Sequence, residues 1–359
     1  ITPAIEYPYG ETPIVLDPQG GALDHVNLSV NDSTLVLAGS TGSKLNVLSL
    51  AREENMMTDE VTNTETRIDL PQMTKQVKAL YIDPRQQWLY VINDRAQADV
   101  FSLRDKSLNG RYKLVDDATT EITASTQLVG GISLIIGDSK GGLAQWFMAR
   151  DPDGEQRLKQ IRTFQMGTAP IVEISAEERR KGFTALDAAG QFGVFHSTAH
   201  RTLLVDQVVE GQGIFGLSPR ANRVIVEAGG KLQPLLLDNP HPEVSWSALW
   251  SKVWYENYDE PKYVWQSTAA NTDFEPKLSL SPLTFGTLKA AFYAMLLAAP
   301  LAVAAAIYTA YFMAPGMRRK VKPVIELMEA MPTVILGFFA GLFLAPYVEG
   351  HLPGIFSLL

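Results

Sequence analysis

Two glycine-rich stretches are the first candidates for chemistry, because loops of this kind can wrap backbone amides around a phosphate group. They are GSTGSK at 39–44 and GDSKGG at 137–142. Neither has the spacing or the Lys-Ser/Thr ending of a P-loop, and each falls between two apolar runs rather than before a helix. Since glycine tolerates a positive φ, we interpret both stretches as hairpin turns.

Metal binding and catalysis are not supported by the remaining polar residues. DPQGG at 17–21 and DPDGE at 151–155 lack the twelve-residue calcium-loop pattern and fit β-turns with proline at the second position. The five histidines include no HExxH spacing; His196 and His200 are four apart, but they span a strand end and a turn. No nucleophile–base pair stands out, so the sequence predicts a protein with no catalytic residue, metal or cofactor of its own.

The elements that must position any functional residues include two apolar runs near the C-terminus. No charged residue occurs at 290–317 or at 330–348. A helix of roughly 20 apolar residues crosses a bilayer, and only closed hydrogen-bonded structures are stable in lipid. The sequence therefore predicts a transmembrane hairpin, with helices at about 284–314 and 324–348 and a loop at about 315–323.

The predicted loop is basic and gives the orientation. It carries Arg318, Arg319, Lys320 and Lys322 and no acidic residue. Short loops rich in Lys and Arg stay in the cytoplasm, so residues 1–281 are expected outside, which in a bacterium is the periplasm next to the inner membrane. The complete absence of cysteine is compatible with this placement.

Charge excludes some partners for the exterior part. Residues 1–281 contain 26 Lys/Arg and 36 Asp/Glu, a net charge of −10, whereas residues 282–359 contain 5 and 3. Such an acidic balance argues against binding nucleic acid or an anionic lipid surface.

The exterior part also repeats. Five segments share the order strand, polar turn, apolar strand, Gly/Asp-rich turn, strand: 26–50, 78–103, 122–148, 172–197 and 214–237. Their central strands begin at Leu35, Leu89, Leu134, Phe183 and Val224, which are 54, 45, 49 and 41 residues apart. A short alternating run precedes each segment: TPIVLD, TRIDL, YKLVD, KQIRTF and RTLLVD. Four strands every 40–50 residues are typical of a propeller blade. We predict an all-β repeat domain at 1–242, a β-propeller with WD40-like four-stranded blades, in preference to a sandwich.

Residues 243–281 are expected to form an aromatic collar and linker. Trp246, Trp250 and Trp254 recur every four residues, which predicts an amphipathic helix over 244–258. Indole suits the membrane interface, where one side of the ring is wet. The stripe is equally compatible with packing on protein, and both interpretations stay open.

The C-terminal part, 282–359, carries a series of short motifs: Gly286-Thr287-Leu288, Pro300, Ala314-Pro315, the basic residues from Arg318 to Lys322, Glu326-Leu327 and Pro332-Thr333 followed by Gly337-Phe338. Through these motifs, over about 65 residues, it resembles the inner-membrane permease subunits of phosphate-type ABC importers, the Pst family, and in particular its PstC-like branch. The sequence departs from the family at Met328 to Met331 and at Leu336. In place of the family's short external segment stands the repeated β domain.

This resemblance implies the partial fold of an ABC importer permease that carries phosphate or a related oxyanion. It implies a second permease subunit, cytoplasmic ATPase subunits and a periplasmic substrate-binding protein as partners, besides membrane lipid. It also implies that the ATPase-docking loop lies beyond Leu359. Among these residues, Pro300, Pro332, Thr333 and Gly337 are candidates for the substrate path. The alternative is a membrane-anchored propeller that serves as a scaffold or sensor.

Overall fold

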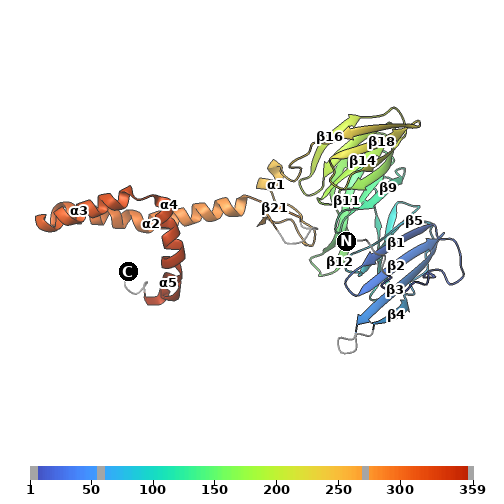
Figure 1. Ribbon diagram of the computed structural model, residues 1–359, viewed down its shortest axis with the longest axis horizontal. Helices are drawn as coiled ribbons and strands as arrows, with labels where there is room; N and C mark the ends of the chain where they lie inside the picture. Colours follow the sequence, from blue (N-terminus) through green and yellow to red (C-terminus); the bar gives the residue numbers. More distant parts are fainter. Residues whose placement is uncertain (1–6, 55–60, 269–274, 355–359) are drawn as a thin grey trace. The chain divides into compact units, whose positions relative to one another are not determined.

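The computed structural model describes residues 7–54, 61–268 and 275–354. The chain divides into two compact units, Ile1–Thr284 and Phe285–Leu359, of which the first consists mainly of β-sheets and the second of helices (Figure 1).

Four of the sheets in the first unit are antiparallel meanders whose four strands follow chain order. Sheet 1 contains β1 (His25–Val30), β2 (Thr34–Thr41), β3 (Lys44–Glu54) and β4 (Val61–Arg67). Sheet 2 contains β5 (Val77–Ile82), β6 (Trp88–Asn93), β7 (Gln97–Ser102) and β8 (Ser107–Lys113). Sheet 3 contains β9 (Ile122–Gln127), β10 (Leu134–Asp138), β11 (Gly142–Arg150) and β12 (Gln156–Gln165). Sheet 4 contains β13 (Ile171–Ala176), β14 (Gly182–Asp187), β15 (Gln191–His196) and β16 (Arg201–Gln207). Sheet 5 has three strands, β17 (Ile214–Leu217), β18 (Arg223–Ala228) and β19 (Lys231–Leu236).

A recurring polar residue fixes the second hairpin in sheets 2, 3 and 4. Asn93, Asp138 and Asp187 each end the second strand, and each side chain accepts hydrogen bonds from the backbone N–H groups two and four residues further on. Such side-chain bonds stabilise a tight turn. The turn interpretation of 39–44 and 137–142 is confirmed, because β2 pairs with β3 and β10 with β11 across them.

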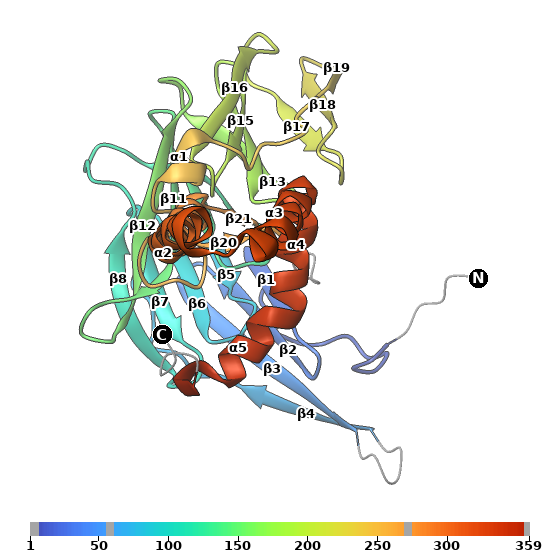
Figure 2. The same cartoon turned by 90° about the vertical axis from the view of Figure 1, so that its left-hand side faces the viewer.

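Apolar cores join successive sheets face to face. Core residues of sheet 1 pack on sheet 2, those of sheet 2 on sheet 3, those of sheet 3 on sheet 4 and those of sheet 4 on sheet 5. Aromatic rings reinforce the third core, where Phe183 stacks on Phe195 and Phe164 meets both rings edge to face. The five sheets follow one another along an arc (Figure 2). The first strands of sheets 1, 2 and 3 line a polar cavity of about 920 Å³.

These sheets confirm the predicted repeat and correct it in detail. Each predicted central strand is the second strand of a sheet and begins within one residue of the expected position. The short alternating runs, however, extend the preceding sheet: β8, for example, pairs with β7. The first run, at 12–17, is not a strand. Among the described residues no apolar core joins sheet 5 to sheet 1, so a closed propeller stays a prediction.

Both end sheets keep apolar side chains on their outer faces. Val26, Leu28 and Val30 of β1 are more than half exposed. On sheet 5, Ile225 and Leu232 are also more than half exposed. Residues before β1 cover part of the outer face of sheet 1, where Leu16 packs on Leu48 and Leu50.

The second unit contains two helices that are long and apolar enough to cross a membrane, Ser281–Phe312 and Thr333–Gly350. The first combines α2 (Ser281–Ile307) with a π-helical segment, η1 (Tyr308–Phe312). The second combines α4 (Thr333–Phe339), η2 (Ala340–Leu344) and α5 (Ala345–Gly350). No residue of these two described spans is buried, as expected of surfaces that face lipid or other transmembrane helices.

Between the two spans, the predicted loop at 315–323 is wrong, because α3 (Pro315–Ala330) occupies this stretch. Pro315 stands in the first turn of α3, where its missing N–H costs nothing, and the helix ends just before Pro332. An ion pair one turn apart, Lys322 with Glu326 at 3.9 Å, lies along it. The second span therefore begins at Thr333 rather than at 324.

The collar also differs from its prediction. The helix expected over 244–258 is limited to α1 (Trp246–Trp250), whose first turn is capped by the Ser245 hydroxyl. After Ser251 the backbone is extended, and Val253 pairs with Lys262 in an antiparallel bridge. A two-stranded sheet of β20 (Trp265–Gln266) and β21 (Lys277–Leu278) then leads into α2.

Candidate functional site

Residues 251–268 and 275–280, which we call the strap, bind to one end of the sheet stack. In an antiparallel meander the turns between the first and second strands, and between the third and fourth, lie at the same end. The strap meets this end in three sheets. Arg85 of sheet 2 donates to Asn257 Oδ1 at 3.3 Å, and the backbone N–H of Arg150 in sheet 3 donates to Asp259 at 3.0 Å. Sheet 4 contributes Lys181.

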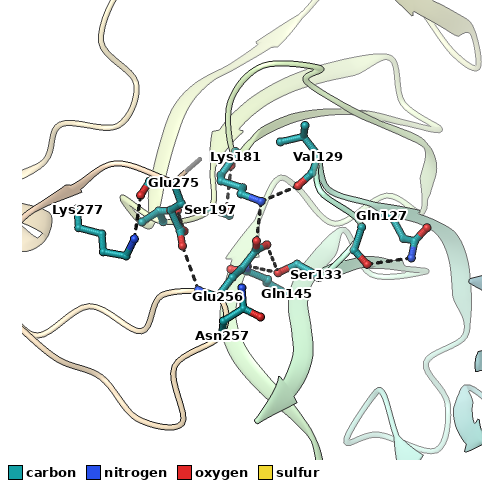
Figure 3. Close-up of polar contacts among 12 residues, drawn as sticks. Gln127, Val129, Ser133, Gln145, Lys181, Ser197, Glu256, Asn257, Glu275 and Lys277 are labelled. Carbon is teal, nitrogen blue, oxygen red and sulfur yellow. Dashed lines mark hydrogen bonds and ion pairs between the residues drawn. The ribbon is translucent and has the colours of Figure 1, made fainter. Parts of the chain in front are cut away.

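An ion pair between Glu256 of the strap and Lys181 lies at the centre of this contact (Figure 3). The two charged atoms are 2.5 Å apart, and the side chains of Lys181 and Glu256 are 2% and 4% exposed. Lys181 Nζ also donates to the carbonyl of Val129 at 2.6 Å, and the Ser133 hydroxyl donates to Glu256 Oε1 at 2.6 Å. Buried charges need such partners, because removing an ion from water costs several kcal/mol.

The network continues through sheet 3. Gln145 Nε2 donates to the Ser133 hydroxyl at 2.9 Å, and Gln145 Oε1 accepts from the Arg162 guanidinium at 2.7 Å. The same guanidinium donates to the backbone carbonyl of Trp254 at 2.5 Å. The strap is thus bound by its main chain as well as by the Glu256 carboxylate.

A second buried carboxylate, Glu275, links the two described segments of the strap, 251–268 and 275–280. Glu275 Oε2 accepts the backbone N–H of Glu256 at 3.0 Å, and Glu275 Oε1 accepts the Thr198 hydroxyl. Lys277 Nζ lies 5.6 Å from the ring centre of Tyr255, a cation–π distance.

Burial shifts the titration of this network. It is the main cause that raises the pKa of Glu275, and the neighbouring charge of Glu256 adds to the rise. Burial also lowers the pKa of Arg162, against the opposing effects of Glu275 and Glu256. The pKa of Tyr255 rises to about 12, again mainly through burial.

Chemically, this network can hold the strap but offers no reactive group. The side-chain oxygens of Glu256 and Glu275 are occupied by donors from the sheets and from the strap itself. No cluster of three or more His, Cys, Asp or Glu suited to a metal ion occurs within the described ranges. Sequence reasoning missed Lys181, Arg162, Glu256 and Glu275, because charged residues in a chain are ordinarily solvated and nothing local marks these as buried.

His196 gives a pH-dependent prediction for this end of the stack. Its side chain is buried and accepts the backbone N–H of Ala199 at 3.2 Å. Burial, followed by the charges of Arg180 and Arg162, lowers the pKa of His196 to about 3. Unfolded chains bind this proton near pH 6.5, so the contribution of neutral His196 to stability is complete above that pH and is lost as the pH falls towards about 3.

Acidification from about pH 7.5 to about pH 5 should therefore lower the free energy of unfolding by about 2 kcal/mol more in the wild type than in His196→Asn. The asparagine Oδ1 stands at the position of Nδ1 and keeps an acceptor for Ala199 without the titration. The raised pKa of Glu275 acts in the opposite direction, but it is common to both proteins. Urea unfolding at several pH values measures the difference, and equal pH slopes would contradict the prediction.

Of the predicted substrate-path residues, one lies in the first span and three lie at or near the beginning of the second. Pro300 lies inside α2, which continues through it, and Pro332 immediately precedes α4. Thr333 is the first residue of α4, and a Cβ added to Gly337 would meet no atom within 4 Å. The role of these four residues in a substrate path remains a prediction. Of the basic residues, Arg318 donates to the carbonyls of Ala310 and Met313 at the end of the first span, whereas Arg319, Lys320 and Lys322 are exposed on α3.

The three tryptophans that the sequence places on one helix face differ in their surroundings. Trp246 and Trp250 are exposed, whereas Trp254 is half-buried. The indole N–H of Trp254 donates to the carbonyl of Tyr258 at 2.8 Å, and its ring meets Phe147 edge to face. Trp254 thus packs on protein, whereas the membrane-interface interpretation stays a prediction for Trp246 and Trp250. His200, four residues from His196, contacts the carbonyl of Thr163 and the ring of Phe164.

Sequence comparison shows that part of this chain is similar to an ABC transporter permease. The relative is the probable ABC transporter permease protein YqgH of Bacillus subtilis (strain 168), which is 38% identical over 78 residues. That stretch is 21% of this chain and 25% of the relative, so the match spans about a quarter of the curated protein's length. No family model matches the chain.

Proposed function

We propose that this chain is part of an inner-membrane permease subunit of an ABC importer for phosphate or a related oxyanion. The similarity to an ABC transporter permease carries the proposal, and the two apolar helices support a location in the membrane. Phosphate as substrate rests on the motif resemblance from Gly286 to Phe338. Permeases of this class work with ATPase subunits, and a second permease subunit and a periplasmic binding protein complete the proposed assembly.

In this proposal residues 1–281 form a periplasmic accessory domain. The four face-to-face cores support a propeller-like stacking of its sheets. The basic side chains on α3 support a cytoplasmic position for that helix. Pro300, Pro332, Thr333 and Gly337 are proposed to line or to shape the substrate path, with close helix packing permitted at Gly337.

Uptake of labelled phosphate tests the function. Phosphate-starved cells with and without the gene are compared, with sulfate and molybdate uptake measured in parallel. We expect loss of phosphate uptake alone, restored by the full-length gene. Unchanged uptake of all three anions would reject the importer and favour the membrane-anchored scaffold or sensor.

The orientation is tested separately, and the absence of native cysteine makes labelling clean. Glu260 and Arg319 are both exposed, one in the strap and one on α3. In intact spheroplasts an impermeant maleimide should label Glu260→Cys and not Arg319→Cys. Labelling of Arg319→Cys alone would reverse the proposed orientation.

A further inference from the structure

Four exposed aromatic side chains lie on the two segments that bond to the residues directly before α2. Trp246 is 81% exposed, Trp250 43%, Tyr263 45% and Trp265 43%. Exposed aromatic groups gathered in one place are unusual on a soluble surface, and they mark an interaction site. From here on, the name aromatic collar means these four residues and not the predicted segment 243–281.

Hydrogen bonds tie the aromatic collar to the residues that lead into the first span. The carbonyl of Leu249 accepts from Leu280 N at 2.8 Å, and the carbonyl of Trp250 accepts from the Ser281 hydroxyl at 3.3 Å. On the other side, Val264 O accepts from Ser279 N at 3.1 Å, and Trp265 pairs with Leu278. Trp246 lies at the other end of the same short helix, about 6 Å along its axis from Trp250.

The backbone that carries these rings is bound to the sheets rather than loosely tethered. The strap between Trp250 and Ser281 is bound to three sheets through the network of Glu256 and Glu275, and Trp254 is packed against Phe147. A flexible linker could bring its aromatic groups to any surface. Here the backbone holds them at the level of residues 278–281, directly before the apolar run that begins at Ser281.

We propose that the aromatic collar lies in the headgroup layer of the lipid bilayer. The occupant of this surface follows from covalent continuity, because a span that enters the hydrocarbon after Ser281 brings the preceding residues to the interface. Indole and phenol rings suit this layer, since one part of each ring is apolar and the other can form hydrogen bonds. The net charge of −10 on residues 1–281 makes ring insertion, rather than attraction to anionic lipid, the expected cause of binding.

This inference rests on the membrane location in the proposed function, but not on the substrate. It differs from the sequence prediction in one respect: Trp265 and Tyr263 take the place of Trp254. The sequence could not show this, because Trp265 follows Trp254 by eleven residues and is linked to α1 only through the segment of β21, where Trp265 pairs with Leu278 and Leu280 N donates to the carbonyl of Leu249.

The tryptophans themselves provide the test. All six lie between Trp88 and Trp265, and none lies in the spans. The full chain is reconstituted into phosphatidylcholine vesicles whose lipid is brominated either close to the headgroup or near the chain ends. Because three of the six tryptophans belong to the collar, shallow bromine should quench roughly half of the emission, and deep bromine clearly less.

Two variants show which tryptophans are quenched by the brominated lipid. The triple variant Trp246→Phe, Trp250→Phe and Trp265→Phe changes only exposed side chains and should lose the shallow quenching. The single variant Trp254→Phe should keep it. Flotation of the vesicles shows separately whether the chain is in the membrane.

Each result decides the proposal. A chain that does not float rejects the collar together with the membrane location. A chain that floats without shallow quenching keeps the membrane location and rejects the collar. In that case, quenching by iodide shows rings in water, and protection from iodide shows rings covered by protein. Stronger quenching by deep than by shallow bromine would also overturn the headgroup assignment.

Discussion

Lys181→Met should lower the free energy of unfolding by about 3–5 kcal/mol, because it leaves the buried Glu256 carboxylate without its ion-pair partner. It also removes one of the two cations that favour the charged form of Glu275, the other being Arg162. Glu256→Gln should cost less. It leaves the Lys181 ammonium with the Val129 carbonyl, and it removes the like charge beside Glu275. A larger loss for Lys181→Met than for Glu256→Gln would therefore show that the neighbouring carboxylates Glu256 and Glu275 repel each other at the strap.

Denaturant unfolding of the full chain in detergent, followed by tryptophan emission, measures both variants, since every tryptophan lies in the first unit. The double variant should lose less than the sum of the single variants by more than about 1 kcal/mol, as expected of partners in contact. Lys262→Met is the matched control. Its partner Glu260 is 3.5 Å away, both side chains are at least half exposed, and the loss should stay below about 0.5 kcal/mol. An equally small loss for Lys181→Met would contradict a structural role for the network.

Gly190→Ala should be the most damaging single-methyl change in the sheets, at about 3 kcal/mol or more. Gly190 lies between β14 and β15 with a φ of +88°. An added Cβ would lie 2.1 Å from the carbonyl oxygen of Val209 and 2.9 Å from that of Gly211. Because both obstacles are backbone atoms, relief requires moving the segment that leads into sheet 5.

Gly154→Ala separates the steric part from the conformational part. Gly154 has nearly the same φ, +89°, but a Cβ there would meet nothing within 4 Å. This variant should lose only the roughly 1–2 kcal/mol of a left-handed alanine. Thermal or urea unfolding of the two variants, measured side by side, gives the difference between their losses of stability. Equal losses would show that the segment around Val209 moves away from the added Cβ at little cost.

The repeat was predictable because its signals are local. Alternating apolar residues and Asp- or Gly-rich turns recur along the chain, and the second strands at Leu89, Leu134 and Phe183 begin within one residue of their predicted positions. Closure of a propeller is a long-range property, and no local pattern encodes it. The charge of the basic stretch at 315–323 predicts a loop, whereas the structure has α3 there, and Pro315 is a favoured residue in the first turn of a helix.

The strap was not predictable for a different reason. Its ion pair joins residues 75 apart in the chain, and the hydrogen bond from Ser133 to Glu256 joins residues 123 apart. The four-residue spacing of the tryptophans predicts a helix over 244–258. Tertiary contacts override this local preference after Trp250, where the helix ends. The guanidinium of Arg162 holds the carbonyl of Trp254 outside the helix that the spacing predicted.

Because each apolar core joins only neighbouring sheets, the stability of the first unit is close to a sum over adjacent pairs, as in a linear array. Such arrays fray from their ends, and within the described residues the apolar cores join sheets 1 and 5 to one neighbouring sheet each instead of two. The strap fastens to sheets 2, 3 and 4, the part of the array that frays last. The domain can therefore lose an end sheet and keep its anchorage to the chain that enters α2.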